Sequence, residues 1–455
     1  MLELFGRPYG RCDGTSRRSF LKAGVLGVAG LSLADLLRVK AEAETAGKPS
    51  PDDLSVILVW LDGGPPQHET YDPKPDAPAE YRGPLKAIGT KVPGVFLSEL
   101  LPEHARLMDK MSIIRSMHHN NGDHFAAAHW MLTGYLGSNA LSLGPQYPSV
   151  GSIVARLKGA KQPGMPAYVG LPNTHSVGLA PGYHGAAYLG VAYNPFSADG
   201  DPNNDGYRVA NLALPSGVDS HRVDHRRGLL TAFDNARRDV DGTGLMDGLD
   251  RFSREAFTMV TGPAARAAFD LHKEDPKLRD RYGRHQWGQS ALLARRLVEA
   301  GVRYVTLTFG GWDMHSSIEK SVRGAVPVVD RAVGTLVDDL DERGMLDSTI
   351  VLVMGEFGRT PRINNGLAGI DPVPGRDHWG EVMSVLVAGG GFARGRVIGA
   401  SNARGEVPKD RPVTPQDLCV TIYRQLGIDP ETTFLNRSGR PITIGSTGRV
   451  ITELC

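Results

Sequence analysis

Four stretches of the chain are mainly apolar, and each ends at a turn that contains glycine. They are residues 54–61, 302–309, 349–354 and 382–388. An apolar run of this length, bounded by turn residues, is typical of a strand that is buried on both faces, as in a parallel sheet. The pattern therefore predicts four buried strands.

Segments with helical periodicity precede two of these strands. Residues 289–300 carry apolar side chains at helical spacing, and so does the region between Val329 and Leu340. Strands that alternate with helices of this length are typical of an α/β layered fold, because each helix returns the chain to the start of a parallel neighbour. The sequence therefore predicts, over residues 54–455, an α/β domain with a mostly parallel central sheet flanked by helices.

Residues 180–285 have a different composition from the rest. They are rich in Gly, Pro and Asn, and then basic at residues 222–239, where we expect a helix. We interpret this region as a loop-rich insertion or cap. Within it, residues 201–206 match the first half of a calcium-binding loop, but Leu212 stands where that loop needs a bidentate glutamate, which favours a solvated turn.

The N-terminal segment has the order of an export signal. Residues 16–22 read Ser-Arg-Arg-Ser-Phe-Leu-Lys, an apolar stretch follows at residues 23–34, and Ala-Glu-Ala at residues 41–43 offers a cleavage site. The paired arginines make this pattern typical of a twin-arginine signal over residues 1–43. We therefore expect the twin-arginine machinery as a partner and a periplasmic or extracellular location, although an uncleaved signal could act as an anchor. No later stretch is long enough for a transmembrane span.

Composition narrows the function classes. The chain has 455 residues, a formal net charge of +1, 41% hydrophobic and 22% charged residues, values that are ordinary for a packed globular protein. A charge near zero provides no basic surface for nucleic acid, so we expect no nucleic-acid partner. The 56 glycines are about 12% of the chain, against about 7% in average proteins, and they indicate many tight turns. Loops should therefore carry much of the chemistry.

Several common catalytic and structural motifs are missing from the sequence. Cys12, Cys419 and Cys455 are too few and too far apart for a disulfide framework or a zinc ribbon. The chain also lacks a Gly-x-Ser-x-Gly elbow, a Walker loop, and a Gly-x-Gly-x-x-Gly turn between a strand and a helix. Common serine hydrolases, P-loop enzymes and dinucleotide oxidoreductases therefore have no support.

Ionisable residues directly follow three of the predicted strands. Asp62 follows the first, Asp313 and His315 follow the second, and Glu356 follows the third, with Arg359 close behind it. The carboxyl ends of parallel strands meet at one edge of a sheet, so we expect these side chains to converge there. Asp313 and His315 can lie on the same side of an extended turn. Arg359 could either pair with Glu356 or bind an anionic substrate.

Histidines cluster at residues 117–129. Four of them fall within twelve residues, at His118, His119, His124 and His129. Histidine with aspartate or glutamate is the usual ligand set for Zn, Mn or Fe, so we expect the cluster to contribute metal ligands. A further histidine, at position 378, lies in the segment Arg-Asp-His-Trp after an irregular loop.

Three motifs resemble a known family. They are Gly-Gly-Trp-Asp-Met-His at residues 310–315, Gly-Glu-Phe-Gly-Arg-Thr at residues 355–360 and Gly-Arg-Asp-His-Trp at residues 375–379. The chain from about residue 54 to 430 resembles the DUF1501 proteins, which are exported by the twin-arginine route and look like members of the alkaline phosphatase and sulfatase superfamily. The resemblance implies a metal-binding site and an ester-hydrolysing activity.

The resemblance also implies roles for single residues. Asp62 is expected as the first metal ligand, Asp313 and His315 as a second pair, Glu356 as the counterpart of the superfamily's Asp-His aspartate, and His378 as the late histidine ligand. Two positions depart from the superfamily pattern, because Phe357 replaces a histidine ligand and His124 stands where sulfatases carry their nucleophile. Ala128 likewise replaces the sulfatase arginine. Sulfatase chemistry of the formylglycine type is therefore not expected, and His124 is expected as a metal ligand, with a nucleophilic role as the alternative.

Together these observations predict an exported, metal-dependent hydrolase of phosphate or sulfate esters that acts through metal-activated water. One or two divalent ions (Zn, Mn, Fe or Ca) would be held by Asp62, His124, Asp313, His315, Glu356 and His378, and Arg359 would stabilise the developing anion of a small anionic ester. The alternative is a catalytically silent binding or scaffold protein that retains the fold. A transferase would need a hydroxyl nucleophile, which the expected position lacks.

Overall fold

The computed structural model describes residues 49–137, 144–209, 212 and 262–455. Residues 51–455 form one compact unit. The predicted export signal at residues 1–43 and the basic helix predicted at residues 222–239 lie outside the described residues.

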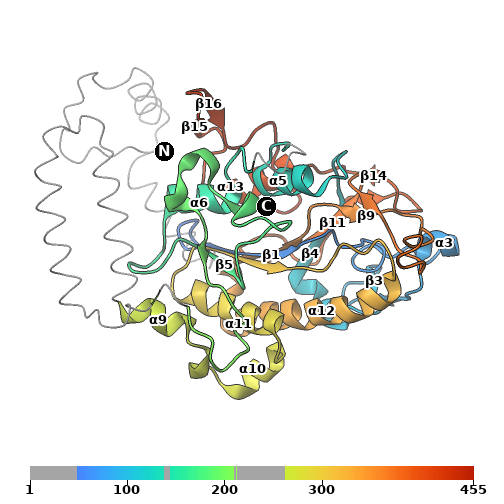
Figure 1. The fold of residues 1–455 in the computed structure, drawn as a ribbon, viewed down its shortest axis with the longest axis horizontal. Coiled ribbons are helices and arrows are strands. Elements are labelled where there is room, and N and C mark those ends of the chain that lie inside the picture. The colour runs from blue at the N-terminus through green and yellow to red at the C-terminus, as the bar shows by residue number, and fades with distance from the viewer. Residues whose placement is uncertain (1–48, 138–143, 210–211, 213–261) are drawn as a thin grey trace, which may run out of the picture. The chain divides into compact units, whose positions relative to one another are not determined.

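An eight-stranded sheet forms the centre of this unit (Figure 1). In spatial order the strands are β12 (Val397–Ile398), β4 (Met111–Met117), β11 (Met383–Ala388), β8 (Thr349–Met354), β1 (Ser55–Leu61), β7 (Tyr304–Phe309), β5 (Tyr168–Leu171) and β6 (Phe196–Ser197). β11 is antiparallel to both of its neighbours, while every other pair in the sheet is parallel. The prediction of an α/β fold with a mostly parallel sheet is confirmed.

The central strand β1 shows why the sheet is covered on both sides. Ile57, Val59 and Leu61 belong to one hydrophobic core, together with residues of α11 (Gln286–Glu299) and α12 (Ile318–Glu342). The residues between them, such as Leu58 and Trp60, belong to a second core. Successive side chains of a strand point to opposite faces, so a strand that is apolar at every position must be buried on both.

Helices provide that cover on each face (Figure 1). The second core contains residues of α5 (His124–Thr133), α6 (Val150–Lys158) and α13 (Pro415–Gln425). The helices α4 (Pro102–Arg106), α9 (Pro263–Phe269) and α10 (Pro276–Tyr282) contribute to the first core, and α3 (Ala79–Arg82) is a single turn. Among the described residues, no helix combines the length and apolar character that a membrane span requires.

Short elements complete the described fold. Four two-stranded ribbons pair β2 (Ala87–Gly89) with β3 (Phe96–Ser98), β9 (Gly358–Arg359) with β10 (His378–Trp379), β13 (Ala400–Ser401) with β14 (Pro408–Asp410), and β15 (Thr433–Leu435) with β16 (Pro441–Thr443). Single 3-10 turns cover Met108–Lys110, Gly182–His184, Ala187–Leu189, Val191–Tyr193, Leu271–Lys273 and Leu346–Ser348.

The flanks of the predicted insertion at residues 180–285 are integrated into the domain. β6 pairs with β5 at the edge of the sheet, and α9 and α10 both pack on α11. Asp201 accepts a hydrogen bond from the backbone N–H of Asn203 at 2.8 Å, which is the turn that the sequence favoured over a calcium loop. Cys419 and Cys455 are free thiols.

Candidate metal-binding site

Three adjacent parallel strands deliver the site's acidic residues to one edge of the sheet. β1 lies between β8 and β7, and the residues that follow these strands include Asp62, Glu356 and Asp313. The loops that carry these residues therefore start at the same edge of the sheet, as expected. Gly63 has a φ of 118°, and a Cβ atom there would lie 2.6 Å from the backbone nitrogen of Asp313. Only glycine allows the loops after β1 and β7 to approach this closely.

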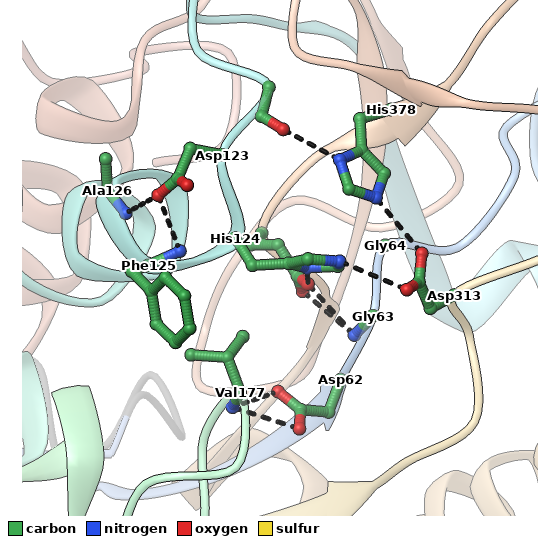
Figure 2. A network of polar contacts seen from close by, with 12 residues as sticks. Asp62, Gly63, Gly64, Asp123, His124, Phe125, Ala126, Val177, Asp313 and His378 are labelled. Carbon is green, nitrogen blue, oxygen red and sulfur yellow. Dashed lines mark hydrogen bonds and ion pairs between the residues drawn. The ribbon is translucent and has the colours of Figure 1, made fainter. Parts of the chain in front are cut away.

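Glu356 is fully buried and connects two parts of the site. Its carboxylate accepts hydrogen bonds from the backbone N–H of Gly63 at 3.0 and 3.2 Å, and its Oε1 lies 2.6 Å from Nδ1 of His124. His124 is the first residue of α5, where Asp123 caps the helix by accepting from two backbone N–H groups (Figure 2). The helix start therefore fixes the backbone of His124, and Glu356 fixes its ring.

Three imidazole rings direct their Nε2 atoms at the carboxylate of Asp313. Nε2 of His315 and Nε2 of His378 each lie 3.0 Å from Oδ1 of Asp313, and 2.9 Å from each other. Nε2 of His124 lies 3.4 Å from Oδ2 of the same carboxylate. Figure 2 shows His124 and His378 approaching Asp313 from two different segments.

The opposite nitrogen of each ring faces an oxygen that can only accept a hydrogen bond. These contacts join Nδ1 of His124 to Glu356 at 2.6 Å, Nδ1 of His315 to Asp377 at 2.7 Å, and Nδ1 of His378 to the backbone carbonyl of Gly122 at 2.8 Å. Each Nδ1 therefore carries the ring's proton, and in the neutral ring the Nε2 atom presents a lone pair. Three lone pairs then face one carboxylate, an arrangement that only a proton or a cation between them can stabilise.

The donor set fits a divalent transition metal. Ligand atoms of His124, Asp313 and His378 all lie within 4.8 Å of one another. Their side chains remain partly exposed, at 22%, 49% and 23%. Imidazole nitrogen with carboxylate oxygen suits Zn or Fe, whereas Ca prefers an all-oxygen set. The hydrogen bonds to each Nδ1 match the outer contacts that usually orient metal-binding histidines.

The two carboxylates next to His124 favour the positively charged form of its ring. Burial works against charge on His124, but its contacts with Asp313 and Glu356 outweigh burial and raise the pKa of His124 to about 9. Burial likewise opposes ionisation of Asp313, but its contacts with His124, His378 and Arg359 hold its pKa far below the usual range. The centre of the site is therefore a stable carboxylate, with the guanidinium of Arg359 on one side and the imidazole rings on the other.

Asp62 occupies a different environment. Its carboxylate accepts a hydrogen bond from the indole N–H of Trp60 at 2.7 Å. It also accepts from the backbone N–H of Val177 at 2.8 and 3.0 Å (Figure 2). Burial and the nearby charge of Glu356 raise the pKa of Asp62 to about 6. Asp62 is not one of the three residues whose donor atoms come together, so its role as a metal ligand stays a prediction, as do those of His315 and Glu356.

Arg359 does not pair with Glu356, the first of its two expected partners. Its side chain is fully buried and pairs with Asp313 at 2.6 Å rather than with Glu356. Its other hydrogen bonds reach the backbone carbonyl oxygens of Gly63, Gly64 and Arg376. With its guanidinium bonded to these acceptors, Arg359 orients Asp313. Its contact with a substrate anion stays a prediction.

The histidine cluster at residues 117–129 divides into different roles. Nε2 of His119 lies 2.7 Å from the backbone carbonyl oxygen of Glu356, and its ring stacks on Trp130. His129 is buried, and its Nδ1 lies 2.7 Å from the backbone carbonyl oxygen of Tyr135. The expectation that the cluster acts as a ligand group is therefore wrong for these two residues, since their ring nitrogens serve backbone contacts. His124 is the member that joins the donor group.

Two contributors to the site were not identified from the sequence. Asp377 holds His315, and Asn364 donates to Oδ2 of Asp377 at 3.1 Å and to the backbone carbonyl of His315 at 3.0 Å. Asp377 stands in the Gly-Arg-Asp-His-Trp motif, so its position next to the predicted ligand His378 could have identified it as part of the site. Asn364 lies in an irregular loop and offers no such signal.

Comparison with protein families identifies the chain. A family model described as "Protein of unknown function (DUF1501)" matches residues 53–455. The chain belongs to this family. No curated protein matches the sequence of this DUF1501 protein.

Several solved structures are distantly similar to this chain. A protein in the alkaline phosphatase superfamily from Vibrio parahaemolyticus is 10% identical with a TM-score of 0.41, covering 88% of this chain and 69% of that one. The PsFucS1 sulfatase from Pseudoalteromonas sp. is 15% identical with a TM-score of 0.39, covering 87% and 71%. The alkaline phosphatase of the Antarctic bacterium TAB5 is 11% identical with a TM-score of 0.38, covering 83% and 99%. Likenesses at this level concern the fold alone.

The three sequence motifs surround the donor group in this DUF1501 protein. Residues 310–315 supply Asp313 and His315, residues 355–360 supply Glu356 and Arg359, and residues 375–379 supply His378. Phe357, from the second motif, packs its ring 4.9 Å from that of His124 and 4.5 Å from that of His378. A carbon-only side chain thus lies where the superfamily resemblance implies a ligand.

Proposed function

We propose that this DUF1501 protein is a metal-dependent hydrolase of phosphate or sulfate esters, exported by the twin-arginine route to the periplasm or beyond. One observation carries the proposal. The Nε2 atoms of His124, His315 and His378 all face the carboxylate of Asp313, while each Nδ1 is committed to an acceptor. A divalent cation bound by these lone pairs would stabilise the arrangement. Protons could stabilise it only if several adjacent imidazole rings became positively charged.

His124, Asp313 and His378 would hold the ion, with His315 as the nearest additional donor. Bound there, a divalent ion supplies Lewis-acid chemistry that polarises an ester oxygen and lowers the pKa of a water. The surrounding residues hold the ligands in place: Glu356 orients His124, Arg359 orients Asp313, and Asp377 orients His315.

Asp62 is the residue that we propose for proton transfer. A pKa of about 6 lets its carboxyl group take up or release a proton near neutral pH, as a general acid or base must. No Ser, Thr or Cys stands at the position of the superfamily nucleophile, which is His124 here. Attack by water on a small anionic ester is therefore the simplest reaction for this site.

The second candidate function is a silent binding or scaffold protein. Phe357 favours it, because a buried aromatic ring beside His124 and His378 removes one position where a ligand is expected. The donor group of His124, Asp313 and His378 favours hydrolysis, since it can hold the metal ion that this reaction would use.

Metal analysis with matched variants tests the proposal. Full-length protein would be purified without chelator and measured by elemental analysis, beside His378→Ala, Asp313→Asn and the control His272→Ala. His272 is an exposed histidine outside the donor group. We expect one or two equivalents of a transition metal in the wild type and the control, and loss of that metal in the other two variants. Hydrolysis of p-nitrophenyl phosphate and p-nitrophenyl sulfate would then be compared across the same four proteins.

Each outcome separates the two candidates. Metal that is lost together with esterase activity in His378→Ala and Asp313→Asn supports hydrolysis. Retained metal and activity in both variants would refute this site. A wild type that contains no metal and cleaves neither ester favours the silent binding protein.

A further inference from the structure

A cavity of about 740 Å³ borders the donor group. The shared wall is Asp377, which lines the cavity and also accepts the hydrogen bond from Nδ1 of His315 at 2.7 Å. Trp379, the residue after His378, lines it as well. A molecule held in this cavity would therefore lie beside the proposed reaction centre.

Two aromatic side chains contribute to the cavity walls. Trp379 is held in place because its indole N–H donates to the backbone carbonyl of Glu406 at 2.7 Å. Tyr81 lies at the end of α3, and the guanidinium of Arg404 sits 5.0 Å from the centre of its ring. Aromatic rings held in this way provide flat apolar surfaces at little cost in conformational entropy.

Polar side chains of the lining are available for a ligand. Arg362 and Asn365 are both exposed, and their side chains make no hydrogen bond or ion pair with the described residues. The neighbouring Asn364 shows the contrast, since its amide donates to His315 and Asp377 and accepts from Gly366 and Gly375. The guanidinium of Arg362 and the amide of Asn365 can therefore form hydrogen bonds with a ligand in the cavity.

From this composition we infer that the cavity binds a sugar ring, and that the ring is the alcohol part of the ester. Flat aromatic surfaces pack against the C–H face of a ring, while planar amide, guanidinium and carboxylate groups bond to its hydroxyls. A phosphate-rich ligand fits less well, because the carboxylates of Asp377 and Glu406 also line the cavity. The binding of the sugar stands on the cavity alone, and its role as the leaving alcohol rests on the proposed hydrolysis.

Binding of neutral disaccharides to metal-free protein tests the cavity without any reaction. Saturation-transfer NMR would be recorded in EDTA with lactose, maltose and N,N′-diacetylchitobiose, each at concentrations up to about 50 mM. We expect millimolar binding of at least one of them, weakened about tenfold or more by Trp379→Ala and by Arg362→Gln. Trp379→Phe should recover much of the binding, because it keeps an aromatic face. Arg208→Gln, an exposed arginine of a different cavity, is the control and should leave binding unchanged.

The outcomes distinguish this inference from the proposed function. Sugar binding that Trp379→Ala and Arg362→Gln abolish supports the cavity site, even in a protein that cleaves no ester. No binding of any of the three sugars overturns the inference, even in a protein that hydrolyses p-nitrophenyl esters. Binding that both variants leave intact places the sugar elsewhere and also overturns it.

Discussion

Neutralising one partner of the buried ion pair between Glu69 and Arg376 should destabilise the domain strongly. The side chains are 1% and 0% exposed, and Nη2 of Arg376 lies 2.7 Å from Oε1 of Glu69. The guanidinium also donates to the backbone carbonyls of Tyr81, Thr360 and Pro361. Because Arg376 directly precedes Asp377, this pair anchors the segment that shapes both the donor group and the adjoining cavity.

The expected magnitude follows from this burial. Glu69→Gln keeps a hydrogen-bond acceptor but leaves a guanidinium buried without its counter-charge, a change that costs about 3–5 kcal/mol of unfolding free energy. For a unit of about 400 residues the unfolding entropy is near 0.85 kcal/mol/K, so the melting temperature should fall by about 4–6 °C. Differential scanning calorimetry in EDTA would measure the shift without a contribution from bound metal.

Two comparisons make the test decisive. Glu319→Gln removes an exposed ion pair with Arg323, at 51% and 47% exposure, and should cost less than about 1 kcal/mol. The double variant Glu69→Met with Arg376→Met should be more stable than the sum of its single variants predicts, because no unpaired charge is then buried. A Glu69→Gln protein that melts within about 1 °C of the wild type would refute the reasoning.

Three further predictions concern single residues. Burial lowers the pKa of His129 to about 4, so the stability that its neutral form provides is complete above about pH 6.5 and is lost as the pH falls toward 4. His129→Gln should therefore remove up to about 3 kcal/mol of this loss of stability in acid, measured in thermal melts. An unchanged dependence of the melting temperature on pH would contradict this. Burial and Glu356 raise the pKa of Asp62 to about 6, so folding is penalised as the pH rises from about 4 to 6. Asp62→Asn in EDTA should therefore raise stability at pH 7 by up to about 3 kcal/mol in the same melts, and no gain would be the contrary result. Asp123→Ala removes the cap of α5 and should cost about 1 kcal/mol, whereas Asp123→Ser should recover most of it; equal stability of the two variants would count against the capping role.

The sequence predicted those parts of the fold and site that depend on local patterns. The apolar runs at residues 54–61, 302–309, 349–354 and 382–388 correspond to β1, β7, β8 and β11, within two residues at each end. A strand that is buried on both faces is mainly apolar, so a charged residue directly after the apolar run indicates where the strand ends. For that reason Asp62 and Glu356 could be placed at the edge of the sheet without a structure.

What escaped prediction depends on contacts between distant segments. β4 (Met111–Met117) carries Arg115 and two serines among its apolar residues, which hides it as a strand. No local pattern indicates that β11 runs antiparallel between β4 and β8. The partner of Arg359 was equally inaccessible. Both Glu356 and Asp313 were available as carboxylates, and only the close approach of the loops at Gly63 decides for Asp313.

The distribution of donors favours one metal ion rather than two. Both oxygens of Asp313 are already faced by imidazoles, and Arg359 supplies a fixed positive charge 2.6 Å from one of them. The remaining carboxylates, Asp62 and Glu356, accept hydrogen bonds from backbone N–H groups. A second ion would have to displace these contacts and approach the guanidinium, in a region where Phe357 provides no donor. One equivalent is therefore the metal content that the geometry favours, with the three rings around Asp313 as the centre of the chemistry.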